Sequence, residues 1–90
     1  MKEVSVQGYV YMICNVEGSI FATDGLCPHA KGKMADGKLV GAVVTCPKHG
    51  AEYDVKTGKN LKKPHFPFAK ASDIRSYPVT IEGKDVFVDV

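Results

Sequence analysis

Two short cysteine–histidine motifs constrain this 90-residue chain more than any other feature. The first is Cys-Pro-His at residues 27–29 and the second is Cys-Pro-Lys-His at residues 46–49. Thiolate and imidazole groups are the usual protein ligands of zinc, copper and iron–sulfur centres. Four of them at this spacing predict a metal site, with the candidate ligands Cys27, His29, Cys46 and His49.

The spacing within each motif bears on which metal is bound. One residue separates cysteine from histidine in the first motif, whereas structural zinc sites usually place about two to four residues between their first two ligands. So tight a loop makes it hard for both side chains to reach one small ion. It is easier if each loop gives its cysteine to an inner iron and its histidine to an outer iron, with sulfides bridging the two.

Length and composition predict one small domain over residues 1–90. Three cysteines, two of them beside histidines, argue against a disulfide framework and fit a reducing compartment. No apolar run approaches the roughly 20 residues of a membrane span, and the N-terminus shows no secretory signal pattern. We therefore expect a cytoplasmic protein that has no membrane partner.

The net charge of +2 is distributed unevenly. Residues 31–63 carry eight lysines against Asp36, Glu52 and Asp54, which makes this third +5 and leaves −3 for the flanks. The positive region surrounds both motifs and would attract an anionic partner surface, although a solvated lysine-rich face is the plainer interpretation. A single modest patch without interleaved aromatic residues does not indicate nucleic-acid binding.

Apolar residues alternate along the chain, and glycine and proline are frequent, which predicts an all-β protein. The clearest expected strand, 9–16, turns at Glu17-Gly18 into a strand over 19–23. Its apolar face is expected to hold Val10, Met12, Cys14 and Val16, with Tyr9, Tyr11 and Ile13 on the other face. Residues 61–72 are expected to form an ordered loop without regular structure. Both motifs then lie in loops just after strands, where a rigid sheet can position them. The other expected strands cover residues 3–6, 38–45, 52–55, 76–81 and 86–90, the last two forming a C-terminal hairpin.

The motifs and their surroundings resemble the Rieske proteins. That family has C-x-H and C-x-x-H motifs, the second followed by glycine and then by an aromatic-Asp pair. Here Gly50 and Tyr53-Asp54 follow the second motif, and Thr57-Gly58 comes next. The resemblance covers nearly the whole chain. It implies the Rieske fold, an antiparallel β-sandwich base with a small cluster-binding subdomain near residues 26–52.

The resemblance also implies one Rieske-type 2Fe-2S cluster, bound through Cys27 and Cys46 on one iron and His29 and His49 on the other. It implies an electron carrier rather than an enzyme. The expected partners are a ferredoxin reductase and a terminal oxygenase or reductase, which would dock transiently at the cluster tip.

Three positions separate this chain from high-potential Rieske proteins. Those proteins have a disulfide-bonded cysteine in each motif, where this chain has Gly32 and Lys48, and a serine that bonds a bridging sulfide, where it has Ala51. Fewer hydrogen bonds to sulfur predict a potential near the low end of the Rieske range, roughly −150 to +300 mV. Tyr53 is expected to raise the potential somewhat, since a tyrosine at this position donates a hydrogen bond to the first cysteine's sulfur in high-potential members.

Alternatives remain open from the sequence. They are the small Rieske subunit of a larger reductase such as an assimilatory nitrite reductase, a fragment-like relative of an oxygenase Rieske domain, and a zinc-stabilised binding module. Cys14 is expected to be a buried inert thiol. His65 is interpreted as a loop residue, and Lys48 either as a solvated lysine or as a docking contact. Similar ferredoxins usually have an additional strand before Tyr9, so we expect a basal sheet edge that is shortened or closed by the C-terminal hairpin.

Overall fold

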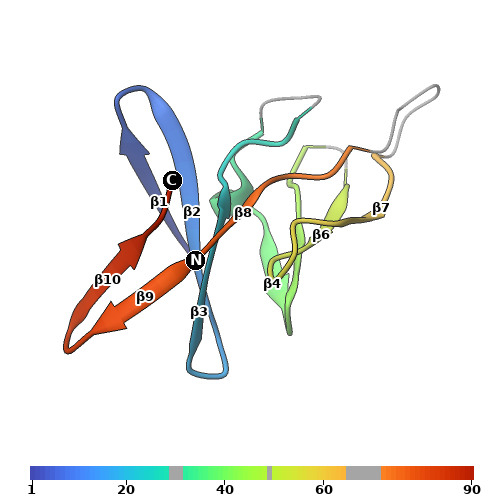
Figure 1. Cartoon of the computed structure of the whole chain (residues 1–90). Coiled ribbons are helices and arrows are strands. Elements are labelled where there is room, and N and C mark those ends of the chain that lie inside the picture. The colour runs from blue at the N-terminus through green and yellow to red at the C-terminus, as the bar shows by residue number, and fades with distance from the viewer. Residues whose placement is uncertain (29–31, 49, 65–71) are drawn as a thin grey trace.

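In a computed structural model the chain is built almost entirely of β-strands, which confirms the all-β prediction (Figure 1). The structure describes residues 1–28, 32–48, 50–64 and 72–90. Within these residues the elements are β1 (Lys2–Val6), β2 (Tyr9–Val16), β3 (Ser19–Asp24), a 3-10 helix η1 (Met34–Asp36), β4 (Lys38–Val40), β5 (Val43–Thr45), β6 (Glu52–Asp54), β7 (Asn60–Lys62), β8 (Ser76–Tyr77), β9 (Val79–Glu82) and β10 (Asp85–Val88).

The strands form three antiparallel sheets. The basal sheet has the order β1-β2-β3-β8, and the second sheet has the order β4-β5-β6-β7. The third is the hairpin β9-β10. In Figure 1 the β9-β10 hairpin and the basal sheet occupy one side of the molecule, and the β4–β7 sheet lies on the other. The structure contains no helix long and apolar enough to cross a membrane within the described residues.

Tight glycine turns set the register of the basal sheet. Glu17 and Gly18 have φ values of 52° and 88°, and Gln7 and Gly8 have φ values of 51° and 83°. Positive φ at both central residues is typical of the two-residue turn whose twist matches that of the flanking strands. The expected turn at Glu17-Gly18 is therefore confirmed, and it pairs Val16 with Ser19 at the start of the β2–β3 ladder.

The predicted faces of β2 are confirmed. Met12 and Cys14 are fully buried, whereas Tyr11 and Ile13 on the other face are partly buried. Strand residues two apart share a face, so this alternation directs Met12 and Cys14 into the core between the two larger sheets. The buried core residues come from both sides of that core: Met12, Cys14, Cys27, Met34, Val44, Cys46, Ala51, Tyr53, Val55 and Ile74.

Several predicted boundaries were wrong. The expected strand over 76–81 is interrupted at Pro78, which has no N–H to donate, so β8 pairs with β3 and β9 pairs with β10. The expected strand over 38–45 is two strands, because Gly41 turns the chain with φ +59°. The loop expected over 61–72 begins inside β7, which pairs with β6, and its residues 65–71 lie outside the described part.

The C-terminal hairpin does not close the edge of the basal sheet. In the described part of the chain β1 pairs with β2, and β10 pairs with β9. Val88 and Val90 instead face Val4 and Ile13 across a cavity of about 110 Å³. The hairpin therefore covers the outer face of the basal sheet and leaves its inner face to the core.

Candidate metal centre

The two cysteines begin two loops that are closed in the same way. Cys27 follows the end of β3, and its N–H donates to the carbonyl of Gly32 at 2.9 Å. Cys46 follows β5 directly, and its N–H donates to the carbonyl of Ala51 at 2.8 Å. Each loop is thus fastened at its base to the residue five positions later. His29 and His49, the other two candidate ligands, lie within these loops but outside the described residues.

The two loops meet at Gly32. A Cβ atom added to this glycine would lie 3.0 Å from Cys46 Sγ and 3.1 Å from Lys48 Cγ, closer than ordinary side-chain packing allows. The residue that closes the first loop therefore lies against the cysteine of the second. This arrangement brings the two motifs together and leaves little room for a side chain at position 32. The positions 32 and 48 are neighbours, but neither carries the sulfur atom needed for a disulfide.

Both cysteine side chains are shielded from water. Cys27 and Cys46 are each 1% exposed and belong to the same buried core. Thiolates that bind a metal need no solvent, and a cluster at the loop tips would shield them further. Two buried cysteines on adjacent loops, with a histidine two or three residues after each, fit an iron–sulfur centre of mixed sulfur and nitrogen ligation.

Tyr53 on β6 makes the contact with Cys27 that the sequence predicted. Its hydroxyl lies 3.6 Å from Cys27 Sγ, and its side chain is 1% exposed. Burial, followed by the hydrogen bond with Cys27, raises the pKa of Tyr53 above its usual value. The hydroxyl therefore stays protonated and can donate to the sulfur when Cys27 is a thiolate.

Asp24 anchors the start of the first loop, and the sequence analysis missed it. Asp24 Oδ1 accepts hydrogen bonds from the hydroxyls of Tyr9 at 2.8 Å and Tyr77 at 2.5 Å. Asp24 Oδ2 accepts from the N–H of Arg75 at 2.9 Å. The β2–β3 register, which pairs Tyr11 with Asp24, could have suggested Tyr9 as a diagonal neighbour. Tyr77 is 53 residues away from Asp24 and left no such signal.

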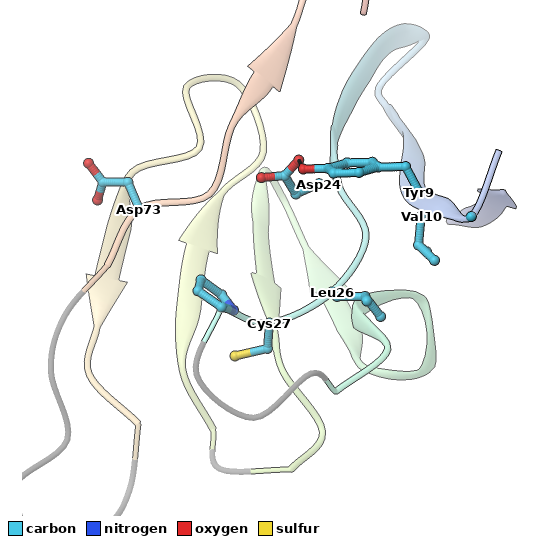
Figure 2. Close-up of a pocket in the computed structure, with 8 residues that line it drawn as sticks. Tyr9, Val10, Asp24, Leu26, Cys27 and Asp73 are labelled. Atoms are coloured by element: carbon cyan, nitrogen blue, oxygen red, sulfur yellow. Dashed lines mark hydrogen bonds between the residues drawn. The ribbon is translucent and has the colours of Figure 1, made fainter. Parts of the chain in front are cut away.

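A cavity of about 270 Å³ lies beside this anchor (Figure 2). Asp24 and Tyr9 line one part of it and Cys27 lines another, so the anchor and the candidate ligand line the same cavity. The basal sheet therefore holds the first loop through side-chain hydrogen bonds as well as through the backbone of β3.

The third cysteine and the third histidine, Cys14 and His65, are not among the candidate ligands that the sequence predicts. Cys14 is fully buried on β2, and burial raises the pKa of its thiol, in agreement with the expected inert role. His65 lies outside the described residues.

This chain is similar to known proteins over most of its length. The family model of the Rieske [2Fe-2S] domain matches residues 1–78. The ferredoxin component of the naphthalene 1,2-dioxygenase system of Pseudomonas aeruginosa is 41% identical over 87 residues, which cover 97% of this chain and 79% of that protein.

Two solved structures are similar over almost the whole chain. The ferredoxin of Sphingomonas yanoikuyae B1 has a TM-score of 0.81 at 33% identity, and the match covers 97% of this chain and 80% of that one. A chain in the complex of reduced oxygenase and oxidised ferredoxin in carbazole 1,9a-dioxygenase has a TM-score of 0.87 at 25% identity. That match covers 98% of this chain and 86% of the other.

Proposed function

Because this chain belongs to the Rieske 2Fe-2S domain family, we propose that its cluster is bound by Cys27 and Cys46 on one iron and by His29 and His49 on the other. The observation that supports this assignment most directly is the meeting of the two cysteine loops at Gly32, beside Cys46 Sγ. The whole of 1–90 then acts as a single Rieske domain, with residues 26–52 forming the cluster-binding subdomain.

The protein is an electron carrier and not itself a catalyst. A bound Rieske cluster supplies one-electron redox chemistry, and the relatives are ferredoxin components of aromatic dioxygenase systems. The chain accordingly carries electrons from a reductase to a terminal oxygenase, which it meets by transient docking at the cluster tip. These relatives favour the carrier role over the reductase subunit and the zinc module. A reducing compartment suits thiolate ligands, so we place the protein in the cytoplasm.

The chain's own residues prepare the site in three ways. The closed bases of the two loops hold Cys27 and Cys46 at fixed positions on the sheets. Burial of both sulfurs excludes water from the inner side of the centre. With Cys27 bound to the cluster as a thiolate, the hydroxyl of Tyr53 would donate to its sulfur and so stabilise negative charge there.

Composition of the purified protein tests the assignment. We expect about two irons and two acid-labile sulfides per chain, with visible absorption and an EPR signal that appears on reduction. Cys27→Ser, Cys46→Ser, His29→Ala and His49→Ala should each lose or severely deplete the cluster. The chain offers matched controls, because Cys14→Ser and His65→Ala remove the same chemical groups at positions outside the proposed ligand set.

The controls should retain iron, sulfide and the EPR signal at wild-type levels. A single bound metal ion without acid-labile sulfide would contradict the cluster. Loss of the cluster from His65→Ala with retention in His49→Ala would show that the ligand set is wrong.

A further inference from the structure

We propose that the loop end of the β4–β7 sheet is a basic docking surface, centred on Lys48, for an acidic surface on the electron-transfer partner. The proposal rests on the proposed function and adds to it the sign of the partner's charge. Five lysines define this surface, which we call the loop-end lysines: Lys33, Lys38, Lys48, Lys62 and Lys63.

The strand register places the loop-end lysines around the two cysteine loops. Lys33 forms a β-bridge with Leu26, the residue before Cys27. Lys38 pairs with Thr45, the residue before Cys46. On the other side of the sheet Lys62 pairs with Glu52, and Lys63 follows it. All five loop-end lysines are exposed, so their ammonium groups are available to a partner.

Lys48 lies at the centre because it belongs to the second cysteine loop itself. Its Cγ atom is 3.1 Å from the point that a Cβ on Gly32 would occupy, and Cys46 Sγ is 3.0 Å from that same point. The apolar stem of Lys48 therefore packs where the two loops meet, while the residue as a whole stays exposed. A lysine in this arrangement keeps its charged end in water directly above the site.

Nearby carboxylates offset this charge only in part. Among described residues, one ion pair involves a loop-end lysine: Oε2 of Glu3 lies 3.9 Å from Nζ of Lys33. Glu52 is partly buried opposite Lys62, and Asp36 lies beside Lys38. Asp24 and Asp73 lie on the cavity side of Cys27, where Asp24 is bonded to tyrosines and Asp73 accepts the N–H of Asn60. With Asp24 and Asp73 on the cavity side, the five loop-end lysines are offset by three carboxylates: Glu3, Asp36 and Glu52.

The far end of the molecule has the opposite charge. The β2–β3 turn carries Glu17, and the turn of the C-terminal hairpin carries Glu82 and Asp85 against Lys84. In Figure 1 both turns lie low in the view, whereas β3 runs upward from its turn toward the residues that precede Cys27. This asymmetry would orient the protein with its cluster end toward a negative surface during encounter.

The occupant we infer is a protein face rich in aspartate and glutamate around the partner's electron-entry point. An electron carrier must bring its redox centre close to that of the partner, and the loop-end lysines surround the centre. Nucleic acid fits less well, because the described lysine surface has no aromatic platform on which bases could stack.

Oxidation of the reduced, cluster-loaded protein by small charged oxidants measures the charge at the electron exit. One electron passes from the protein to hexacyanoferrate(III), giving hexacyanoferrate(II), or to tris(phenanthroline)cobalt(III), giving the cobalt(II) complex. We expect the stopped-flow rate constant with the anionic oxidant to fall as ionic strength rises, and the rate constant with the cationic oxidant to rise.

Charge reversal locates the surface. Lys48→Glu should slow the low-salt reaction with hexacyanoferrate(III) by roughly threefold or more, and should speed the reaction with the cobalt complex. Lys56→Glu is the matched control, because it changes the net charge equally but lies on the turn after β6, at the other end of the sheet. The reduction potential of each variant is measured as well, so that rates are compared at known driving force.

Equal effects of Lys48→Glu and Lys56→Glu, or a rate with hexacyanoferrate(III) that rises with salt, would overturn the docking surface. Polyglutamate and single-stranded DNA distinguish the occupants: polyglutamate should bind wild-type protein more tightly than Lys48→Glu. If the protein binds single-stranded DNA but not polyglutamate at about 0.15 M salt, the assignment of an acidic protein as the partner is overturned. A preparation without a reducible cluster would instead refute the proposed function, before any docking measurement is made.

Discussion

Tyr53 is the described residue that can most directly change the electronic properties of the bound cluster. Its buried hydroxyl lies 3.6 Å from Cys27 Sγ. A hydrogen bond to a ligating sulfur strengthens as the cluster gains negative charge, so it stabilises the reduced form. The sequence predicted this contact from the position of Tyr53 after the second motif, and the geometry agrees with it.

We therefore predict that Tyr53→Phe lowers the reduction potential. If the hydrogen bond differs by about 1 kcal/mol between the redox states, a one-electron couple shifts by about 40 mV. Tyr77→Phe is the control, since it removes a tyrosine hydroxyl that bonds Asp24 and not a cysteine. Protein-film voltammetry of the three proteins provides the measurement. A Tyr53→Phe potential equal to that of wild type would show that the contact carries no redox function.

Tyr77 links stability to alkaline pH. Burial, followed by its hydrogen bond to Asp24, raises the pKa of Tyr77 above the value of about 10 that it has in an unfolded chain. Below that pH the hydroxyl is protonated in both states, and the stabilisation is present in full. As the pH rises above 10, Tyr77 loses its proton first in the unfolded chain. The free energy of unfolding therefore decreases until the pH reaches the pKa of Tyr77 in the folded protein.

The expected outcome is a urea midpoint that decreases between pH 9 and pH 11 less steeply in Tyr77→Phe than in wild type. Tyr53 has a raised pKa as well, so the variant should keep part of the dependence. Parallel curves for the two proteins would mean that Tyr77 ionises equally easily in the folded and the unfolded chain.

At the scale of elements, Gly58 joins the second sheet to the segment that leads into β8. It has φ +81°, its N–H donates to Asp54 at 2.7 Å, and its carbonyl accepts from the N–H of Ile74 at 2.9 Å. A Cβ atom at Gly58 would lie 2.0 Å from the carbonyl oxygen of Ile74. Glycine is thus required here for both its conformation and its size.

We predict that Gly58→Ala reduces the free energy of unfolding by at least about 3 kcal/mol, because backbone must move to admit the methyl group. Gly41→Ala is the matched control: Gly41 also has positive φ, at 59°, but nothing lies within 4 Å of its Cβ position. In that variant the free energy of unfolding should fall only by the cost of placing an alanine at positive φ, about 1–2 kcal/mol. Urea denaturation compares the two, and equal losses would contradict the close approach to Ile74.

At the scale of the whole molecule, the two candidate cysteine ligands are part of the hydrophobic core. Cys27 and Cys46 belong to the same buried cluster as Met12 of the basal sheet and Val44 of the second sheet. Ligands that lie in the core couple metal binding to folding, because the bound group crosslinks elements that pack on each other. A chain of this size has little other buried surface to replace that contribution.

Removal of the cluster should therefore destabilise both sheets together, by several kcal/mol. Thermal unfolding of holo and apo protein followed by circular dichroism is the measurement, with reconstitution from iron and sulfide as the control for damage. Apo protein that melts at the holo temperature would show that the sheets fold independently of the centre.

The sequence by itself determined the local features. Alternation of apolar residues predicted β2, including the burial of Met12 and Cys14, and Glu17-Gly18 predicted the turn after it, because both signals arise between near neighbours in the chain. The two motifs identified the candidate ligands and the family. Their assignment as ligands stays a prediction, with His29 and His49 outside the described residues.

Only the tertiary structure decided what depends on contacts between distant segments. The pairing of β7 with β6 overrode the absence of alternation around Leu61. The close approach of Gly32 to Cys46 cannot be predicted from the residues next to them in the sequence, and neither can the hydrogen bond from Tyr77 to Asp24. Sequence patterns report which face of a strand is apolar, but the partner that covers that face is selected by packing of the whole chain.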